Sequence, residues 1–266
     1  MNYKTVISVK NLVKKFGSFT ANDNLNFEVF EGEIFGFLGA NGAGKTTAIR
    51  ILSGLSAPTS GEVTVAGYNA GKEPEKIKKS IGYMCQKFSL YPDLTIRENI
   101  MLYGGIYGMR KTAIKERTED LLEKLSFVEY GDRLIADLPL GMKQKLAFSV
   151  AVFHEPKIVF LDEPTGGVDP ITRRQFWEMI YETADKGITV FVTTHYMDEA
   201  EYCDRISIMS EGRIVAIDTP EELKKQYDAK SVEEVFVKIA RPAGPSLSHE
   251  PLLLNPPLPG EKTSSP

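Results

Sequence analysis

The sequence predicts an α/β protein built around a parallel sheet, and two observations support this fold class. First, short β-branched, apolar runs alternate with segments of helical pattern, which is typical of strands joined by crossover helices. The expected strands are 157–161, 189–193 and 205–209, and the helical segments between them are 172–184 and 197–202. Second, a glycine-rich loop joins a compact apolar run at 33–38 to a helical segment.

The N-terminal third adds strands of a different kind. Two segments alternate apolar and polar residues, as half-buried antiparallel strands do, and Gly17 lies at a turn between them. A glycine-bounded stretch further on resembles a hairpin strand. The predicted elements are strands 5–9, 25–29 and 33–38, a helix at 46–55 and a hairpin strand within 60–67.

The middle of the chain, about 88–153, has a helical character. Within 113–125, apolar residues recur at helical spacing, so we expect a mostly helical subdomain inserted into the core. The last 26 residues hold seven of the 15 prolines, among serines and glycines. Such a composition does not sustain a packed core, so we predict a domain over 1–240 and a disordered tail over 241–266.

Composition narrows the classes of function. The formal net charge is -4, so no overall basic field favours nucleic acid as a partner. No apolar run approaches the ~20 residues that span a bilayer. The first ten residues alternate and predict a strand instead of a signal peptide. Cys85 and Cys203 are the two cysteines, and we expect both to be reduced and in or near the core.

The glycine-rich loop has the pattern of a phosphate-binding loop. It follows a predicted strand and opens a predicted helix, the context in which the pattern is meaningful. Glycines let successive backbone N–H groups point at phosphate oxygens, the lysine reaches the terminal phosphates, and the threonine hydroxyl suits Mg²⁺. The predicted ATP-binding residues are Gly39, Ala40, Asn41, Gly42, Ala43, Gly44, Lys45, Thr46 and Thr47, with Thr46 on the metal.

Two adjacent carboxylates follow the predicted buried strand at 157–161. Ligands of open α/β sheets lie at the carboxyl ends of strands, so Asp162 is assigned to the Mg²⁺ shell. Glu163 is predicted to polarise the attacking water as general base. The alternative is that Glu163 only caps the turn at Pro164.

With these motifs in place, residues 5–225 resemble the ATP-binding cassette (ABC) ATPase family. Further segments match the family in order and spacing, and each also has a plain structural alternative as a core or surface residue. The resemblance implies that Phe16 stacks on adenine, Gln86 contacts Mg²⁺ and the attacking water, and His195 senses the γ phosphate. It also implies a signature loop at Leu138, Pro139, Leu140, Gly141 and Met142, and a dimer-crossing loop at Asp169.

The resemblance implies the rest of the organisation. The fold would be a P-loop NTPase, with a RecA-like core, an antiparallel β subdomain and a helical subdomain. ATP would be held between the phosphate loop of one cassette and the signature loop of a second, identical or different. The cassette would power a separate integral membrane permease at the cytoplasmic face of the membrane, with 88–97 lining the groove for a coupling helix. Segments 141–146, 166–170 and 231–236 resemble cassettes of ABC-2 type exporters most.

The signature loop departs from the usual Leu-Ser-Gly-Gly of the family. Pro139 stands for the serine and has neither a hydroxyl nor an N–H for the opposite γ phosphate. Leu140 adds bulk where backbone should approach closely, while Gly141 and the following helix remain. Because losing one oxyanion-type donor costs ~10²–10³ in rate, we expect weakened turnover.

Two other functions stay open at this point. One is a soluble regulatory cassette acting on ribosomes, DNA or metal-cluster assembly, although the chain has neither a second cassette nor a long coiled coil. The other is a nucleotide-binding module without turnover, which the altered signature favours and Glu163, Gln86 and His195 oppose.

Overall fold

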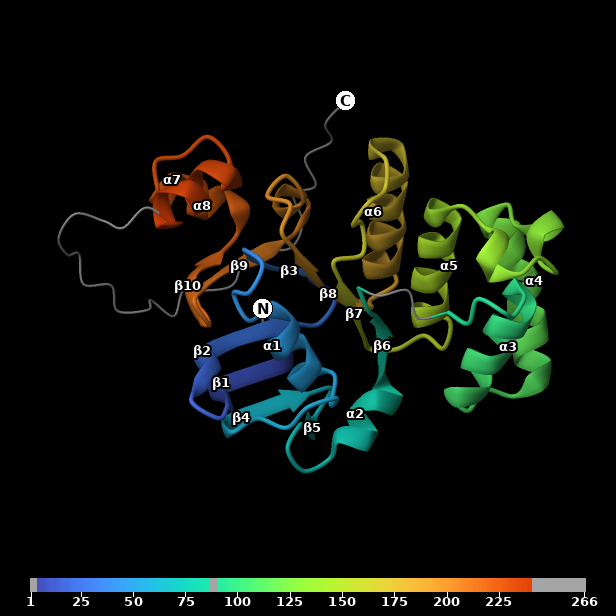
Figure 1. Ribbon diagram of the computed structural model, residues 1–266, viewed down its shortest axis with the longest axis horizontal. Helices are drawn as coiled ribbons and strands as arrows, with labels where there is room; N and C mark the ends of the chain where they lie inside the picture. The colour runs from blue at the N-terminus through green and yellow to red at the C-terminus, as the bar shows by residue number, and fades with distance from the viewer. Residues whose placement is uncertain (1–3, 87–89, 241–266) are drawn as a thin grey trace.

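The computed structural model describes residues 4–86 and 90–240, and it contains two sheets and a separate group of helices (Figure 1). The strands are β1 (Thr5–Phe16), β2 (Phe19–Phe30), β3 (Ile34–Gly39), β4 (Ser60–Val65), β5 (Tyr68–Asn69), β6 (Ile81–Met84), β7 (Ile158–Asp162), β8 (Thr189–Thr194), β9 (Arg205–Ser210) and β10 (Arg213–Asp218). The α-helices are α1 (Lys45–Leu52), α2 (Pro74–Ser80), α3 (Ile96–Ile106), α4 (Lys111–Leu125), α5 (Leu140–Val152), α6 (Pro170–Asp185), α7 (Pro220–Gln226) and α8 (Val232–Ala240). Short 3₁₀ turns are η1 (Val128–Tyr130), η2 (Ile135–Asp137) and η3 (Glu199–Tyr202).

The larger sheet has six strands in the order β10-β9-β3-β8-β7-β6. All neighbouring pairs are parallel except β10, which pairs antiparallel with β9. Every residue of β3, β7 and β8 is buried, which explains their continuous apolar sequences. The carboxyl ends of these three central strands lead into the phosphate loop, the paired carboxylates and His195, so the sheet alone brings them to one edge.

The smaller sheet is antiparallel, in the order β2-β1-β4-β5, and packs beside the first (Figure 1). Its β1–β2 hairpin turns at Gly17, as the alternating pattern predicts, and β4 and β5 form the predicted hairpin. The two sheets meet through aromatic side chains. Phe27 of β2 stacks on Phe35 of β3 at a centroid distance of 5.8 Å, and the Phe191 ring of β8 lies 5.6 Å from that of Phe35.

Helices α3, α4 and α5 form a group at one side of the molecule (Figure 1). Helix α3 begins with a capping box in which Thr95 accepts from Glu98 N, and Glu98 bonds back to Thr95 N. Gly104 lets α4 approach closely, because a Cβ there would lie 2.9 Å from Ile114. Helix α5 then leads back to the sheet at β7, so this group is an insertion between β6 and β7, as the composition predicts.

One predicted element is wrong. The helical segment expected at 197–202 is only the 3₁₀ turn η3. The reason is that Glu199 is fully buried and bonded to two threonines of other elements, and the chain becomes extended again at Cys203 to enter β9. Tertiary contacts therefore override the helix propensity of this segment.

Two further predictions can be compared with the structure, and a third cannot. Neither Cys85 nor Cys203 is in a disulfide, and Cys85 is partly exposed while Cys203 is buried. Among the described helices, none has the length and apolar character needed to cross a bilayer. The predicted disordered tail at 241–266 lies outside the described residues.

Candidate functional site

The phosphate loop begins where β3 ends and finishes at the N-terminus of α1. Two of its glycines are required by close contacts. A Cβ at Gly39 would lie 2.6 Å from the carbonyl oxygen of Met209. Gly44, with φ of 103°, would place a Cβ 2.4 Å from the carbonyl oxygen of Ala21. Both positions therefore require glycine, because the loop backbone packs closely against the neighbouring strands.

Lys45 is almost fully buried in this loop. Its Nζ donates to the carbonyl of Gly39 at 2.8 Å and of Ala40 at 3.3 Å, and it lies 3.6 Å from Glu163 Oε1. Burial lowers the pKa of Lys45, and the neighbouring charges of Glu163 and Asp162 oppose that shift. The ammonium is thus held at the base of the loop by carbonyls and carboxylates.

Asp162 is the last residue of β7, and its side chain is buried. Oδ1 accepts a hydrogen bond of 2.6 Å from the Thr193 hydroxyl. Burial raises the pKa of Asp162, while the bond from Thr193 and the charge of Lys45 lower it. A buried carboxylate of this kind is stabilised by a cation beside it, and a carboxylate with a hydroxyl and an amide makes a hard-oxygen donor set that suits Mg²⁺. The predicted Asp162, Thr46 and Gln86 therefore fit this metal in chemical type.

Glu163 is the point at which the predicted catalytic residues meet. Its Oε2 accepts a hydrogen bond of 2.8 Å from Gln86 Nε2 and lies 3.3 Å from Nδ1 of His195, without hydrogen-bond geometry. Its Oε1 lies 3.6 Å from the ammonium of Lys45. These residues come from the ends of β6, β7 and β8 and from the start of α1, so only the fold brings them together.

The backbone of Glu163 is also specialised. Its φ is 49°, which is uncommon for a residue with a side chain. The Glu163 N–H is held by the carbonyl of Thr193 at 3.0 Å and by its hydroxyl at 3.1 Å. A strained conformation persists where surrounding bonds determine it, and such residues cluster at functional sites.

The remaining predicted nucleotide-binding residues differ in exposure, since Ala43 is buried and Thr47 is partly exposed. Thr46 is exposed at the start of α1, and Ala40, Asn41 and Gly42 are exposed in the loop. Phe16, at the end of β1, is 56% exposed, so it is not a core residue. Phe19 pairs opposite it in the hairpin and is 64% exposed, which makes two aromatic rings at this tip.

The predicted signature loop lies at the start of α5. Leu138 is buried, Pro139 is the N-cap without a side-chain bond to the helix, and Leu140 is 49% exposed. Gly141 packs against α6, because a Cβ there would lie 2.9 Å from Thr172 Cγ2. Asp169 caps that helix, since its carboxylate accepts from the N–H groups of Ile171 and Thr172, each at 3.0 Å. The signature loop and the dimer-crossing loop are therefore neighbours within one chain.

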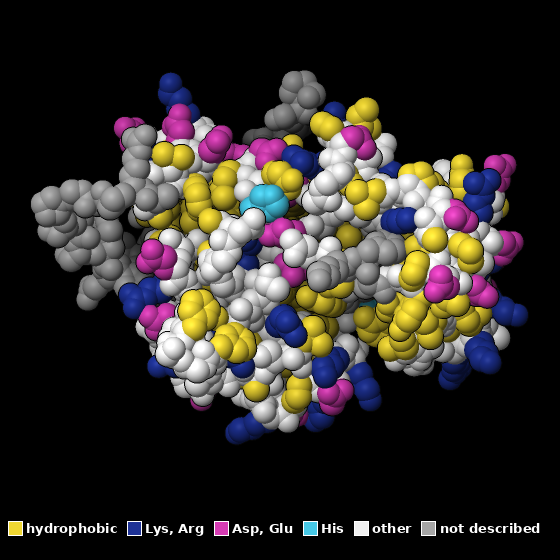
Figure 2. Space-filling view, in the orientation of Figure 1, with side chains coloured by type: hydrophobic (Ala, Val, Ile, Leu, Met, Phe, Trp, Pro, Cys, Tyr) yellow, Lys and Arg dark blue, Asp and Glu magenta, His cyan; other side chains and the backbone are white. Residues whose placement is uncertain are grey.

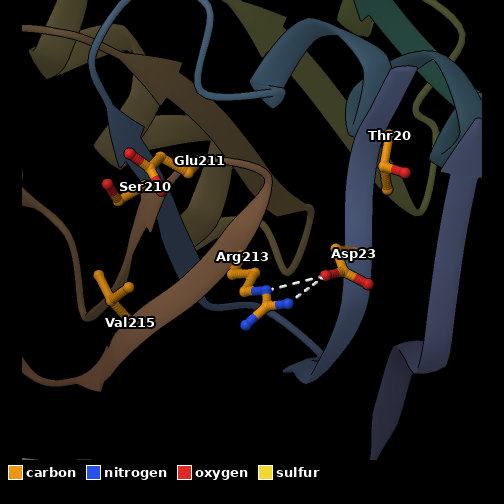
Figure 3. A pocket seen from close by; sticks show the side chains of 6 residues that line it. All are labelled: Thr20, Asp23, Ser210, Glu211, Arg213 and Val215. Carbon is orange, nitrogen blue, oxygen red and sulfur yellow. Dashed lines mark hydrogen bonds and ion pairs between the residues drawn. The ribbon is translucent and has the colours of Figure 1, made fainter. Parts of the chain in front are cut away.

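A shallow groove near the phosphate loop holds none of the predicted residues. It is lined by Thr20, Asp23, Ser210, Glu211, Arg213 and Val215, with the guanidinium of Arg213 bonded to Asp23 (Figure 3). The β9–β10 turn at its edge donates from Gly212 N to the carbonyl of Ala43, at 3.0 Å. This groove therefore supports the loop from outside and carries no reacting group of the predicted set.

Sequence reasoning missed two residues that support the site. Thr193 bonds both adjacent carboxylate residues, and its place at the carboxyl end of β8 is the signal that could have found it. Asn22 is fully buried on β2 and donates from Nδ2 to the carbonyl of Gly44 at 3.1 Å. A polar residue buried behind a functional loop has no pattern in the sequence.

The family is shown by comparison with known proteins. The ABC transporter family matches residues 22–166, which is more than half of the chain. The chain therefore belongs to the ABC transporter ATP-binding family. The predicted family, fold class and ATP binding are confirmed.

Individual relatives narrow down the kind of ABC protein that this chain is similar to. It is 49% identical over 241 residues to the "Probable multidrug ABC transporter ATP-binding protein YbhF" of Escherichia coli (strain K12), covering 89% of this chain and 42% of YbhF. It thus spans less than half the length of that relative. It is 37% identical over 233 residues to the "Linearmycin resistance ATP-binding protein LnrL" of Bacillus subtilis (strain 168), covering 87% of this chain and 75% of LnrL.

Solved structures of ABC cassettes have the same fold as this chain. One described as "Structure of ATP binding subunit of ABC transporter" matches with a TM-score of 0.81 and 30% identity, over 89% of this chain and 100% of that one. A dimeric post-hydrolysis cassette bound to ADP and Pi matches with a TM-score of 0.73 and 26% identity, over 80% of this chain and 98% of that one. The two-sheet core with a helical insertion is therefore the fold of ABC cassettes.

Proposed function

We propose that this chain is the ATP-hydrolysing subunit of a membrane exporter and that Glu163 is its general base. The observation that supports the catalytic part is the meeting of Gln86, His195 and Lys45 at one carboxylate. A nucleotide-binding module without turnover has no use for a strained glutamate with these three neighbours. The convergence therefore favours hydrolysis over simple binding.

In the proposed reaction, the oxygen of water attacks the γ phosphorus of ATP, and the bond to the β–γ bridging oxygen breaks. The water proton goes to Glu163, and the products are ADP and phosphate. Gln86 holds the carboxylate and contacts the attacking water, His195 senses the γ phosphate, and Lys45 offsets charge on the β and γ phosphates. Mg²⁺ would be held by Thr46 and Asp162 with Gln86, and its role is to neutralise phosphate charge.

The nucleotide site is completed from outside the chain in this proposal. Phe16 stacks on adenine, and the signature residues Pro139 to Met142 of a second cassette face the γ phosphate. Leu140 and Ile171, both exposed, lie beside the loop that ends at Asp169 and support a face that a second cassette, identical or different, covers.

The partner in the membrane is proposed from the relatives and from the helical insertion. YbhF is named as a probable multidrug ABC transporter ATP-binding protein and LnrL as a linearmycin resistance ATP-binding protein, and both names favour export. Hydrophobic side chains gather on the visible face of the helical insertion (Figure 2). Exposed apolar residues of the insertion include Tyr91, Leu102 and Ile106. We infer that a separate permease binds this surface at the cytoplasmic face of the membrane.

Glu163→Gln tests the catalytic assignment. The amide keeps the shape but accepts no proton, so phosphate release should fall about 10²–10³-fold while ATP still binds. The measurement is phosphate release by the purified protein, beside an equilibrium ATP titration. Equal rates for the variant and the wild type would sink the assignment of Glu163. Recovery of no integral membrane protein with the chain from membranes would sink the exporter role.

A further inference from the structure

We propose that Glu199 is a positioning residue that joins the His195 loop, the Glu163 loop and helix α6 into one unit. The proposal rests on the proposed hydrolysis for its kinetic test, and on geometry for the rest. The sequence predicts a helical segment around Glu199 and assigns the residue no role of its own, and in the structure this segment is the short turn η3.

The carboxylate of Glu199 has no exposed surface and uses both of its oxygens. Oε1 accepts from the Thr165 hydroxyl at 2.5 Å, and Oε2 accepts from the Thr194 hydroxyl at 2.7 Å. Both threonines are themselves 1% exposed. Charge-assisted bonds of this kind in a buried place hold their donors strongly.

The two threonines belong to the loops that carry the reaction. Thr165 lies two residues after Glu163, and Thr194 directly precedes His195. Thr194 also accepts from the N–H of Tyr196 at 3.0 Å, which fixes the backbone on the other side of His195. Glu199 therefore constrains both sides of the Glu163–His195 contact from a single carboxylate.

Helix α6 enters the same cluster through Arg173. Its Nε lies 3.5 Å from Glu199 Oε1, and its guanidinium lies 4.3 Å above the ring of Tyr196. Arg173 is four residues after Asp169, whose carboxylate caps α6. A change at the γ phosphate that moves His195 is thus transmitted to the helix that follows the dimer-crossing loop.

A buried carboxylate is costly unless it is paired. Here the Arg173 cation and two threonine hydroxyls supply the pairing, although Glu199 is not among the residues predicted to contact ATP. Burying an apolar side chain would cost less free energy, so the buried charge of Glu199 points to a role in holding these loops in position relative to one another.

Glu199→Gln is the first variant for the test. The amide oxygen accepts from one threonine only, while Arg173 keeps Asp198 at 3.4 Å and the Tyr196 ring. A misplacement of about 1 Å near the chemistry costs about 10²-fold, so kcat for ATP hydrolysis should fall about 10- to 100-fold. The ATP dissociation constant should stay within about twofold, because the phosphate loop does not touch Glu199.

Matched controls come from the same turn and from the partner residue. Glu201→Gln changes the same residue type two positions on, where the carboxylate pairs with Lys224 at 2.8 Å, and should leave kcat unchanged. Thr194→Val removes one hydroxyl donor and should lower kcat like Glu199→Gln, whereas Thr194→Ser keeps the donor and should restore it. Thr194→Val decides the question if the Glu199 variant does not fold.

A second readout needs no hydrolysis. The chain has 3 histidines, so imidazole signals in ¹H–¹⁵N spectra can be assigned with a His195→Gln variant. Glu199→Gln should shift and broaden the His195 signals and leave those of His154 unchanged, since His154 packs elsewhere against Tyr107.

The outcomes separate the two proposals. A fall in kcat with unchanged ATP affinity and altered His195 signals supports the role of Glu199. Wild-type kcat in Glu199→Gln, or a fall in kcat with His195 signals unchanged, overturns it. A wild-type protein without ATPase activity overturns the proposed function instead, and the His195 spectra still decide the positioning role.

Discussion

The two regions of this chain that are predicted to contact ATP, the phosphate loop and the signature loop, are held very differently. On the phosphate-loop side, Lys45 and Asp162 are buried, and Glu163 has three charged or polar neighbours within 3.6 Å. On the signature side, Pro139 gives its helix no side-chain cap, and Leu140 is half exposed. The phosphate-loop side is therefore organised by contacts within a single chain. The signature side presents an exposed surface, and its chemistry depends on the partner that binds there.

Apart from Glu163→Gln, the largest expected effect comes from loosening the phosphate-loop side. Thr193→Val keeps the shape and removes the hydroxyl that bonds Asp162 and the Glu163 N–H. We expect kcat to fall about 10- to 100-fold with little change in ATP affinity, because the carboxylates lose their orientation. Steady-state phosphate release with an ATP titration measures both. Thr193→Ser retains the hydroxyl and is the control; a Val variant as active as the Ser variant would contradict the role of Thr193.

A smaller effect, of opposite sign, is expected from repairing the signature half. Pro139→Ser supplies an N-cap to α5, worth about 1 kcal/mol, and a hydroxyl for the γ phosphate of the partner cassette. We expect ATPase activity at high protein concentration to rise up to about tenfold. Pro139→Ala relieves the proline without adding a hydroxyl and should not raise the rate. If Ala and Ser give the same rate, the missing hydroxyl is not what limits turnover.

The smallest effect concerns the contact between the helical insertion and strand β6 of the larger sheet. The His154 ring stacks on Tyr107 of the helical insertion at a centroid distance of 3.5 Å, and its Nε2 lies 3.2 Å from the carbonyl of Ile81 in β6. Burial lowers the pKa of His154 to about 4. In the unfolded chain the ring takes up a proton near pH 6.5, so the stability present above that pH is lost as the pH falls toward 4.

His154→Phe tests the titration of His154 at this contact. The variant keeps the ring stack and removes the titration, so between pH 7 and 5 its unfolding free energy should fall by about 1–2 kcal/mol less than that of the wild type. This is smaller than the full shift implies because water reaches part of the ring. Urea unfolding at several pH values, read beside the wild type, gives the difference. Parallel pH profiles would show that His154 is not the group responsible.

Much of the site could be predicted because its residues lie in short local patterns. The phosphate loop and the Asp162–Glu163 pair each combine a strand with an adjoining loop, so a single stretch of sequence carries the signal. Strand β6 was missed, since its four residues include a glycine and have little periodicity. Yet β6 is what brings Gln86 to Glu163, because its parallel pairing with β7 aligns Met84 with Leu161.

The supporting residues could not be predicted for a different reason. Thr193, Asn22 and Glu199 act through hydrogen bonds to residues between 5 and 34 positions away, and their own neighbours in sequence say nothing about those partners. Burial converts ordinary polar side chains into strong constraints, and burial is a property of the packed sheet and its loops.

The sequence by itself therefore determined the kind of loop that binds phosphate, the carboxylates that follow a buried strand, and the unusual signature at Pro139 and Leu140. These follow from local residue chemistry and from strand and helix periodicity. Only the tertiary structure decided that Gln86, His195 and Lys45 meet at Glu163, and that Glu199 ties their loops to α6. Those contacts exist because parallel strands far apart in the chain end at the same edge of one sheet.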